Sequence, residues 1–280
     1  MILIALAVIT ATPATLPAAL VAAVPGDVVR LAKGDYSTAT IKDVSFDPPI
    51  TVLAADATVR GISIVNAGGV TWVGGNITQP TAKGFAAGGY AVHINGSRQI
   101  TIRNAVVRDA VRGFVVSSSS DVELIGNRIT GFTIDGFNVA GNSERVTGRD
   151  NYADSGATGE AHPDLWQSWT RAGQVMSDIV VTRNVFVGRA QGVYFGNLPD
   201  RKPAGDPGFD RVSVSDNWIL MSNPTGIGLA DCRECVVTGN FVASLPGSRF
   251  RANAWALRST GLFCGNGMPA LPTSSSAKPC

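Results

Sequence analysis

A short pattern of apolar and polar positions recurs along this chain: an apolar residue, a second apolar residue two positions later, and an asparagine five positions after the first. Side chains two positions apart lie on the same face of a β-strand, so each copy predicts a short strand that ends at an asparagine turn. One copy has Gly148 in the second apolar position, and looser copies end at Asn76 and Asn104. The clear copies end at Asn127, Asn151, Asn184, Asn217 and Asn240, at spacings of 24, 33, 33 and 23 residues.

A second family of short apolar strands lies between these copies. Short strands separated by turn residues indicate an all-β architecture. The base period of 23–24 residues is shorter than a propeller blade of about 40–45 residues. It fits one coil of a parallel β-helix, in which equivalent strands of successive coils lie about 4.8 Å apart. The second family comprises residues 113–116, 136–139, 165–168, 192–195 and 226–229.

The recurring asparagines are expected to form a ladder along the axis of such a solenoid. Asparagine tolerates the left-handed backbone conformation and bonds to nearby backbone groups, and stacked amides bond to one another. The alternative is that asparagine only marks turns, as in any β protein. The fixed offset in five copies favours the ladder.

The segment Thr15–Val24 predicts a helix that caps the open end of the first coil, where exposed strand edges would otherwise pair with other chains. Thr15 is the expected N-cap, and the Pro25-Gly26 pair ends the helix. Leu16, Leu20 and Val24 then form one apolar stripe that faces the coil.

We expect one domain over residues 1–280. Residues 1–27 hold the N-terminal strand and the capping helix, residues 28–243 hold the coils, and residues 244–280 form an irregular C-terminal cap or tail. The apolar start, Ile2–Thr10, is interpreted either as a first strand or as a trimmed secretory signal. It is too short to span a bilayer.

Charge and cysteine content narrow the class of partner and compartment. Lys plus Arg is 23 and Asp plus Glu is 21, a net charge of +2, which argues against nucleic-acid binding. Four cysteines without zinc-ligand spacing favour two disulfides, Cys232–Cys235 and Cys264–Cys280, in an oxidising compartment. We therefore expect a secreted, cell-surface or periplasmic protein.

This layout, with the opening segment Ala18–Tyr36, resembles the pectate-lyase-like superfamily of right-handed parallel β-helix proteins over about residues 13–245. The resemblance implies a right-handed parallel β-helix and a carbohydrate-active or glycan-associated function. That superfamily holds lyases, hydrolases, epimerases and non-catalytic spikes, so the fold does not choose among them.

Two insertions of about nine residues extend consecutive coils, and insertions in repeat proteins tend to gather on the binding face. They are residues 154–164 and 197–208. We expect them to border a groove that runs across the coils.

The second strand family aligns polar residues between these insertions. If the apolar residues Phe137, Trp166 and Val193 point inward, the alternation of strand side chains places their neighbours outward. The result is a polar row on one flat face, suited to an extended saccharide. The outward row is Asn138, Gln167 and Tyr194, and the residues Asp135, Asp164 and Gln191 align at equivalent turn positions with the same spacings.

The segment His162–Trp169 resembles the His-x-Asp-x-x-Gln segment of several carbohydrate-associated β-helices. For a lyase acting on a uronic acid, His162 is the candidate base that abstracts the C5 proton, and Tyr194 the proton donor. The substrate carboxyl group would bind Gln167 and Asn138, with positive charge from Arg189 or Arg171. The alternative for His162 is a loop-bracing residue.

Other roles stay open for the remaining candidates. Asp135 and Asp164 are interpreted as an acid/base pair for hydrolysis or epimerisation, as a calcium site, or as turn caps. Trp169 is expected either to stack on a sugar ring or to pack against the core or the cap, and Trp166 is expected to be a core residue. His93 is interpreted as an exposed or structural residue several coils away.

The leading hypothesis is an exported polysaccharide lyase that needs no cofactor, a calcium ion near Asp135 and Asp164 being the one alternative. The competing hypotheses are a polysaccharide hydrolase or epimerase, and a non-catalytic glycan-binding or structural module such as an adhesin. The expected partner is a polysaccharide, with no nucleic acid and no membrane span.

Overall fold

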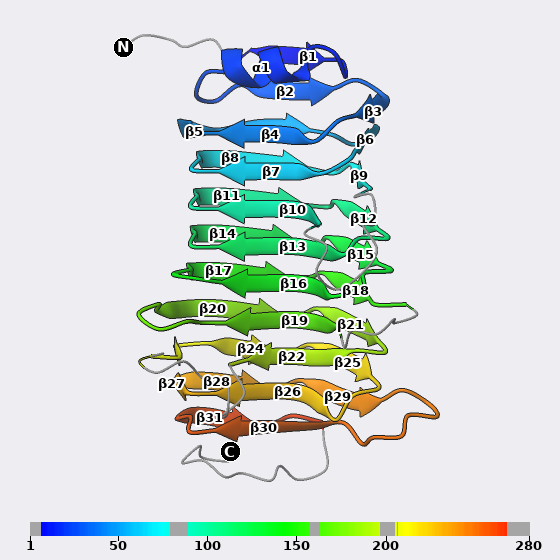
Figure 1. Ribbon diagram of the computed structural model, residues 1–280, viewed down its shortest axis with the longest axis vertical. Coiled ribbons are helices and arrows are strands. Elements are labelled where there is room, and N and C mark those ends of the chain that lie inside the picture. Colours follow the sequence, from blue (N-terminus) through cyan, green and yellow to red (C-terminus); the bar gives the residue numbers. More distant parts are fainter. Residues whose placement is uncertain (1–6, 79–88, 157–162, 197–204, 206, 268–280) are drawn as a thin grey trace.

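The computed structural model describes residues 7–78, 89–156, 163–196, 205 and 207–267. Within that part of the chain, strands from successive coils stack into three parallel sheets, here named A, B and C, around one elongated core (Figure 1). The predicted parallel β-helix is thus confirmed.

Sheet A receives the first strand of each coil, including the strands that precede the recurring asparagines. Its path is β1 (Val8–Ala11), β2 (Val28–Leu31), β5 (Ser45–Leu53), β8 (Gly68–Val73), β11 (Arg98–Arg103), β14 (Ser120–Ile125), β17 (Glu144–Arg149), β20 (Met176–Thr182), β24 (Ser213–Ser215), β28 (Cys235–Thr238) and β31 (Gly261–Cys264), with β23 (Phe209–Asp210) and β27 (Cys232–Arg233) beside it.

Sheet B follows the asparagine turn and is made of shorter strands. They are β3 (Gly34–Tyr36), β6 (Ala57–Val59), β9 (Asn76–Ile77), β12 (Val106–Arg108), β15 (Arg128–Thr130), β18 (Tyr152–Asp154), β21 (Val185–Gly188), β25 (Trp218–Met221) and β29 (Phe241–Ser244).

Sheet C contains the second strand family and carries the candidate site. Its strands are β4 (Ala39–Lys42), β7 (Ile62–Val65), β10 (Tyr90–Asn95), β13 (Arg112–Ser117), β16 (Asp135–Ala140), β19 (Asp164–Trp169), β22 (Gln191–Phe195), β26 (Thr225–Ala230) and β30 (Asn253–Leu257).

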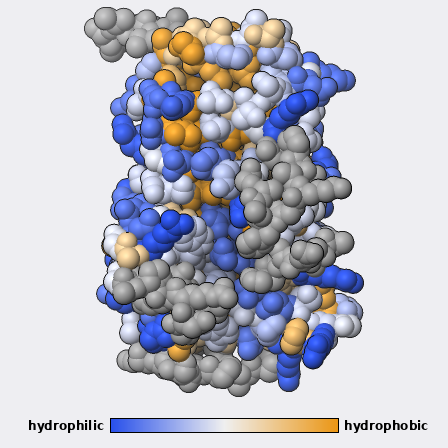
Figure 2. Space-filling model, in the orientation of Figure 1, coloured by the Kyte–Doolittle hydropathy of each residue, from blue (hydrophilic) through white to orange (hydrophobic). Residues whose placement is uncertain are grey.

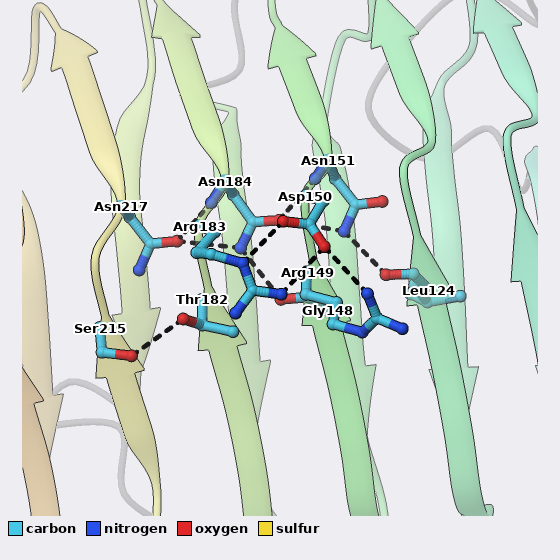
Figure 3. A network of polar contacts seen from close by, with 10 residues as sticks. All are labelled: Leu124, Gly148, Arg149, Asp150, Asn151, Thr182, Arg183, Asn184, Ser215 and Asn217. Carbon is cyan, nitrogen blue, oxygen red and sulfur yellow. Dashed lines mark hydrogen bonds and ion pairs between the residues drawn. The ribbon is translucent and has the colours of Figure 1, made fainter.

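The asparagine ladder is present and buried. In each pair of neighbouring coils, the backbone N–H of one ladder residue donates to the side-chain oxygen of the next, as from Asn151 to Asn184 Oδ1 at 2.9 Å and from Asn184 to Asn217 Oδ1 at 3.0 Å (Figure 3). The amide nitrogen donates back to a carbonyl, as from Asn184 Nδ2 to Gly148 O at 3.0 Å. The side chains therefore satisfy backbone groups at every turn.

The reason given above for asparagine is wrong in one respect. The left-handed residue is the one before each ladder asparagine, for example Asp150 and Arg183. These two side chains form an exposed ion pair, with Arg183 Nε 2.8 Å from Asp150 Oδ1 (Figure 3). The looser copies do not belong to the ladder: Asn104 itself has a positive φ, and Asn76 accepts a hydrogen bond from Arg108.

The core is a stack of large side chains from equivalent positions. Phe114, Phe137 and Trp166 are fully buried and stack at centroid distances of 4.9 and 5.6 Å. Gly148 interrupts the apolar pattern because a side chain there would overlap the ring of Trp166. Trp166 is therefore a core residue, as expected.

The helix α1 (Leu16–Ala22) lies beside β1 and β2 at the N-terminal end of the solenoid (Figure 1), where apolar residues gather on the surface in Figure 2. Leu16 and Leu20 are buried, but Val24 is 48% exposed because the helix ends before it. Thr15 does not cap the helix with its side chain, which instead accepts the N–H of Thr12. That α1 protects the strand edges stays a prediction.

The coils continue beyond the expected boundary at residue 243. Strands β30 and β31 extend sheets C and A, and Asn266 continues the ladder by accepting the Asn240 N–H at 3.1 Å. Residues 253–266 are thus not an irregular tail, because they repeat the alternation and the turn of the earlier coils.

The cysteine prediction is confirmed where it can be followed. Cys232 and Cys235 form a disulfide, and Cys264 is also disulfide-bonded. Its expected partner, Cys280, lies outside the described residues. Among the described helices, none has the length and apolar character needed to cross a membrane.

Candidate functional site

The outer face of sheet C holds a hollow of about 430 Å³ that extends over β10, β13, β16 and β19. We call it hollow 1. Its lining is mostly polar and includes Tyr90, His93, Arg112, Ser118, Asp135, Asn138, Asp164, Gln167, Trp169, Arg171 and Gln174.

Strand register brings the predicted polar residues into line. Asp135 pairs with Asp164, which pairs with Gln191. The intervening positions Phe137, Trp166 and Val193 are fully buried inside the solenoid. The second outward row aligns in the same way, as Asn138, Gln167 and Tyr194.

Asp135 and Asp164 lie at the base of hollow 1 and are 4% and 1% exposed. Gln167 Nε2 donates to Asp164 Oδ2 at 2.6 Å, and Asn138 Nδ2 lies 3.3 Å from Asp135 Oδ2. Asn138 also donates to Gln167 Oε1 at 3.2 Å, so the two amides link the two carboxyl groups. Asp164 Oδ1 is buried and has no hydrogen-bond partner among the described residues.

Burial shifts both carboxyl groups toward the protonated form, and repulsion from Asp135 adds to this shift at Asp164. Burial raises the pKa of Asp135 to about 6, opposed by the positive charge of Arg112, whose Nε lies 3.9 Å from Asp135 Oδ2. Burial and the neighbouring charge of Asp135 raise the pKa of Asp164 well above its usual value. The protonated form is therefore favoured at both carboxyl groups, and more strongly at Asp164, where the charge of Asp135 adds to burial.

This pair predicts a loss of stability as pH rises. A carboxyl group with a raised pKa binds its proton more tightly in the folded state, so its stabilising contribution is complete below the unfolded pKa near 3.8 and is lost as pH rises through about 6 for Asp135. Relative to the Asp135→Asn variant, the wild type should lose on the order of 1–3 kcal/mol of unfolding free energy between pH 4 and pH 7. Urea unfolding at a series of pH values measures the difference.

The exposed Asp216 provides the control for this titration. Asp216→Asn should retain the pH dependence of the wild type, because this carboxyl lies outside hollow 1. The assignment is contradicted if Asp135→Asn follows the wild type at every pH.

One end of hollow 1 is formed by residues that the sequence reasoning did not select. Tyr90 and His93 stack at a centroid distance of 4.8 Å, and the guanidinium of Arg112 lies 5.8 Å from the Tyr90 ring centre. Burial lowers the pKa of His93, which keeps its imidazole neutral at pH 7. The interpretation of His93 as remote is wrong, since β10 is separated from β16 by β13 alone.

The missed residues had a signal in the spacing. Arg112 and Tyr90 precede Asp135 by one and two coils and pair with it through the strand register. The intervals of 23 and 22 residues lie within one residue of the base period of 23–24. Extending the period upstream from Asp135 would have found both.

The opposite end of hollow 1 carries Trp169 and Arg171. Trp169 is half-buried, and the guanidinium of Arg171 lies 4.8 Å from the centre of its ring. The backbone N–H of Arg171 donates to Gln174 Oε1 at 3.0 Å. Both predicted binding residues therefore lie in the hollow.

Four other candidates lie elsewhere or cannot be placed. Tyr194 is buried, with its ring 6.0 Å from that of Trp255, and it does not line hollow 1. Gln191 aligns with Asp164 but is not part of the lining, and Arg189 is exposed in the turn before β22. His162, the predicted base, lies outside the described residues.

The insertions attach at opposite ends of the sheet C strands. The first joins β18 to β19, and the second follows β22; most of each lies outside the described residues. Within the described chain, no three His, Cys, Asp or Glu side chains converge as metal ligands. Calcium takes about six to eight oxygen ligands, so a calcium site would depend on further donors beyond Asp135 and Asp164.

Comparison with known proteins identifies the fold. No family model and no curated protein matches the sequence. Among solved structures, the alginate lyase from Paenibacillus sp. str. FPU-7 aligns with TM-score 0.50 and 14% identity over 97% of this chain and 97% of that chain. PfbA, a surface adhesin of Streptococcus pneumoniae, aligns with TM-score 0.53 and 14% identity over 91% of this chain and 81% of that chain.

The chain also aligns over 89% of its length with the catalytic domain of a GH87 α-1,3-glucanase, of which it spans 62%, at 13% identity and a TM-score of 0.41. At such identities the likeness concerns backbone architecture and not activity. The three parallel sheets and the alignments with the alginate lyase and PfbA agree on the same architecture. The chain is a parallel β-helix protein.

Proposed function

We propose that this protein is a carbohydrate-active enzyme that binds a polysaccharide across sheet C and cleaves a glycosidic bond in hollow 1. The observation that carries the proposal is the carboxyl pair: Asp135 and Asp164 lie in register at the base of a polar hollow, and their surroundings push their pKa values upward to different extents. Two titratable groups with separated pKa values suit an acid and a base.

The pair divides the work of hydrolysis between its members. Asp164, whose pKa is raised by burial and by the charge of Asp135, is the proposed acid that donates a proton to the leaving glycosidic oxygen. Asp135 is the ionised partner, held by Arg112 at 3.9 Å. In glycosidases whose carboxyl groups lie about 5–5.5 Å apart, the ionised group attacks the sugar as the leaving oxygen departs, and water then hydrolyses the glycosyl ester with the other carboxylate as base. Neighbouring parallel strands lie about 4.8 Å apart, which suits this course for Asp135 and Asp164.

The rest of hollow 1 suits a sugar ring. Trp169 offers an aromatic surface beside Arg171, and pyranose rings present apolar faces to such surfaces. Asn138 and Gln167 orient the carboxyl pair and present amide groups to sugar hydroxyls. The half-exposed Arg112 carries positive charge at the other end.

Cleavage by β-elimination, the reaction of a polysaccharide lyase, is the second candidate. It is favoured by the two arginines at the ends of hollow 1, which suit the carboxylate of a uronic acid. The alginate lyase among the similar structures supports this candidate at the level of fold. It requires a base at the C5 proton, for which His162 stays the candidate, with Tyr194 as donor. An epimerase would share that first proton transfer.

A non-catalytic module is the third candidate, since PfbA is a surface adhesin of the same architecture. Under each candidate we place the protein outside the reducing cytosol. The Cys232–Cys235 disulfide supports that location.

A screen of five polysaccharides separates the candidates: alginate, polygalacturonate, hyaluronan, xylan and α-1,3-glucan. Each digest is scored for new reducing ends and for ultraviolet absorbance. Hydrolysis yields reducing ends without absorbance. Cleavage by a lyase yields both, because β-elimination leaves an unsaturated sugar. Binding without either product would identify a non-catalytic module and overturn the proposed function.

A further inference from the structure

A second hollow, of about 590 Å³, lies along the corner where the chain passes from sheet C to sheet A. We call it hollow 2. Five successive coils contribute the same turn to it, and the first residue after each sheet C strand has a positive φ. These residues are Asp43, Asn66, Gly96, Ser118 and Gly141.

Hollow 2 adjoins hollow 1. Ser118 lines both hollows, and Gly141 in hollow 1 precedes Asn142 in hollow 2. A side chain at position 96 or 141 would meet Asn66 Oδ1 or Ser118 Oγ, so glycine keeps the surface low at these two turns. A single extended polymer can therefore pass from the carboxyl pair around the corner into hollow 2.

The base of hollow 2 is held by buried serines. The Ala67 N–H donates to Ser97 Oγ at 3.1 Å, and the Ser97 N–H donates to Ser119 Oγ at 3.1 Å. Ser119 continues the series to Ser143 Oγ at 3.3 Å. These bonds fix the turns, which limits the ordering cost when a ligand binds.

The surface of hollow 2 is hydrophilic and carries positively and negatively charged side chains. Arg98, Ser120 and Glu144 align through the strand register, and Asn66 and Asn142 add amide groups. Hydroxyl, amide, carboxylate and guanidinium groups bond to sugar hydroxyls, whereas a protein partner would be expected to need apolar anchors. Val44 and Ala67 are the apolar side chains in the lining that the structure describes, and neither is aromatic.

We propose that hollow 2 binds the sugar residues of the same polysaccharide that lie beyond the bond cut in hollow 1, so that the enzyme prefers long chains to short oligosaccharides. This inference rests on the proposed function and specifies its substrate as an extended internal segment of the polymer. It also assigns a path that turns from sheet C toward sheet A and the N-terminal coils.

The test fills hollow 2 with an indole and compares a matched position outside it. Ser120→Trp places the ring in hollow 2, while Thr147→Trp places it on the outer face of the neighbouring strand β17, outside both hollows. For the polysaccharide that is degraded fastest in the screen above, kcat/KM is measured with the polymer and with its trisaccharide. Melting temperatures establish that both variants fold.

Ser120→Trp should lower kcat/KM for the polymer about tenfold, equivalent to roughly 1.4 kcal/mol, mainly through KM, and leave the trisaccharide unchanged. Thr147→Trp should change neither. An equal loss on polymer and trisaccharide, or no difference between the two variants, overturns the inference. If Ser120→Trp does not fold, the double variant Arg98→Ala, Glu144→Ala takes its place, with the same expected loss confined to the polymer.

If none of the five polysaccharides is cleaved, the proposed function is wrong, and hollow 2 is then judged by binding. Migration through gels that contain each polysaccharide is compared for the wild type, Ser120→Trp and Thr147→Trp. Weaker retardation of Ser120→Trp alone supports glycan binding in hollow 2. Equal migration of all three proteins overturns it.

Discussion

Replacing Asp164 with asparagine should lower the turnover of the degraded polysaccharide by roughly two to four orders of magnitude, the usual contribution of general acid–base catalysis. The amide keeps the size of the side chain and, with reorientation, can still bond to Gln167, but it cannot give a proton to the leaving oxygen. Substrate binding should change little. Initial rates over a range of substrate concentrations separate kcat from KM.

Asp135→Asn should cause a loss of similar size, because it removes the ionised member of the pair. The two losses should not add, since each variant disables the same pair. Asp216→Asn is the matched control: its carboxyl is exposed and outside hollow 1, so turnover should stay at the wild-type level. Full activity of Asp164→Asn would show that the stacked carboxyls serve the fold and not the reaction.

The second large effect should be a loss of stability in Asn184→Ala, on the order of 2–4 kcal/mol. The substitution leaves the Asn151 N–H and the Gly148 carbonyl without their side-chain partner in the interior. It also breaks the ladder between two coils that support the site. Urea unfolding monitored by circular dichroism measures the change.

Asn76→Ala is the control for that prediction. Asn76 occupies a loose copy of the same sequence pattern, yet its side chain bonds at the surface to Arg108. A loss below about 1 kcal/mol is expected there, as for a solvent-exposed hydrogen bond. Equal losses in both variants would contradict a special role of the buried ladder.

The alignment of Asp135 with Asp164 could be predicted because their spacing of 29 residues equals that of Asn138 and Gln167 on the same two strands. Once Phe137 and Trp166 are assigned to the interior, the pleat places Asn138 and Gln167 outward. The same alternation would turn Asp135 and Asp164 inward, two residues before Phe137 and Trp166, yet both carboxyl groups line hollow 1. The burial of the two carboxyl groups was not readable in this way. Alternation assigns a residue to a face, but it does not say how deeply the surrounding side chains enclose it.

His93 illustrates the limit of the repeat itself. It lies on a strand whose coil lacks a ladder asparagine, since the ladder begins where the Ala105 N–H donates to Asn127 Oδ1. The asparagine pattern therefore did not show how close the strand of His93 lies to Asp135. The strand register continues without the asparagine and brings His93 within two strands of Asn138.

The C-terminal coil shows the converse error. Gly, Pro and Ser after Ser244 favoured a tail, but β30 and β31 pair with the preceding coil. A short strand of small residues such as Ala254 and Ala256 has little local preference of its own. Pairing with an existing sheet edge supplies the hydrogen bonds that its composition does not predict.

The sequence alone determined the solenoid, its period, the asparagine ladder and the stacking of two carboxyl groups, because these follow from alternation and from spacing that repeats along the chain. The tertiary structure decided how deeply those carboxyl groups are buried, that Tyr90, His93 and Arg112 line the same hollow, and that the two hollows adjoin. Those features depend on how side chains and turns of several coils fill the same space, and no local pattern encodes that volume.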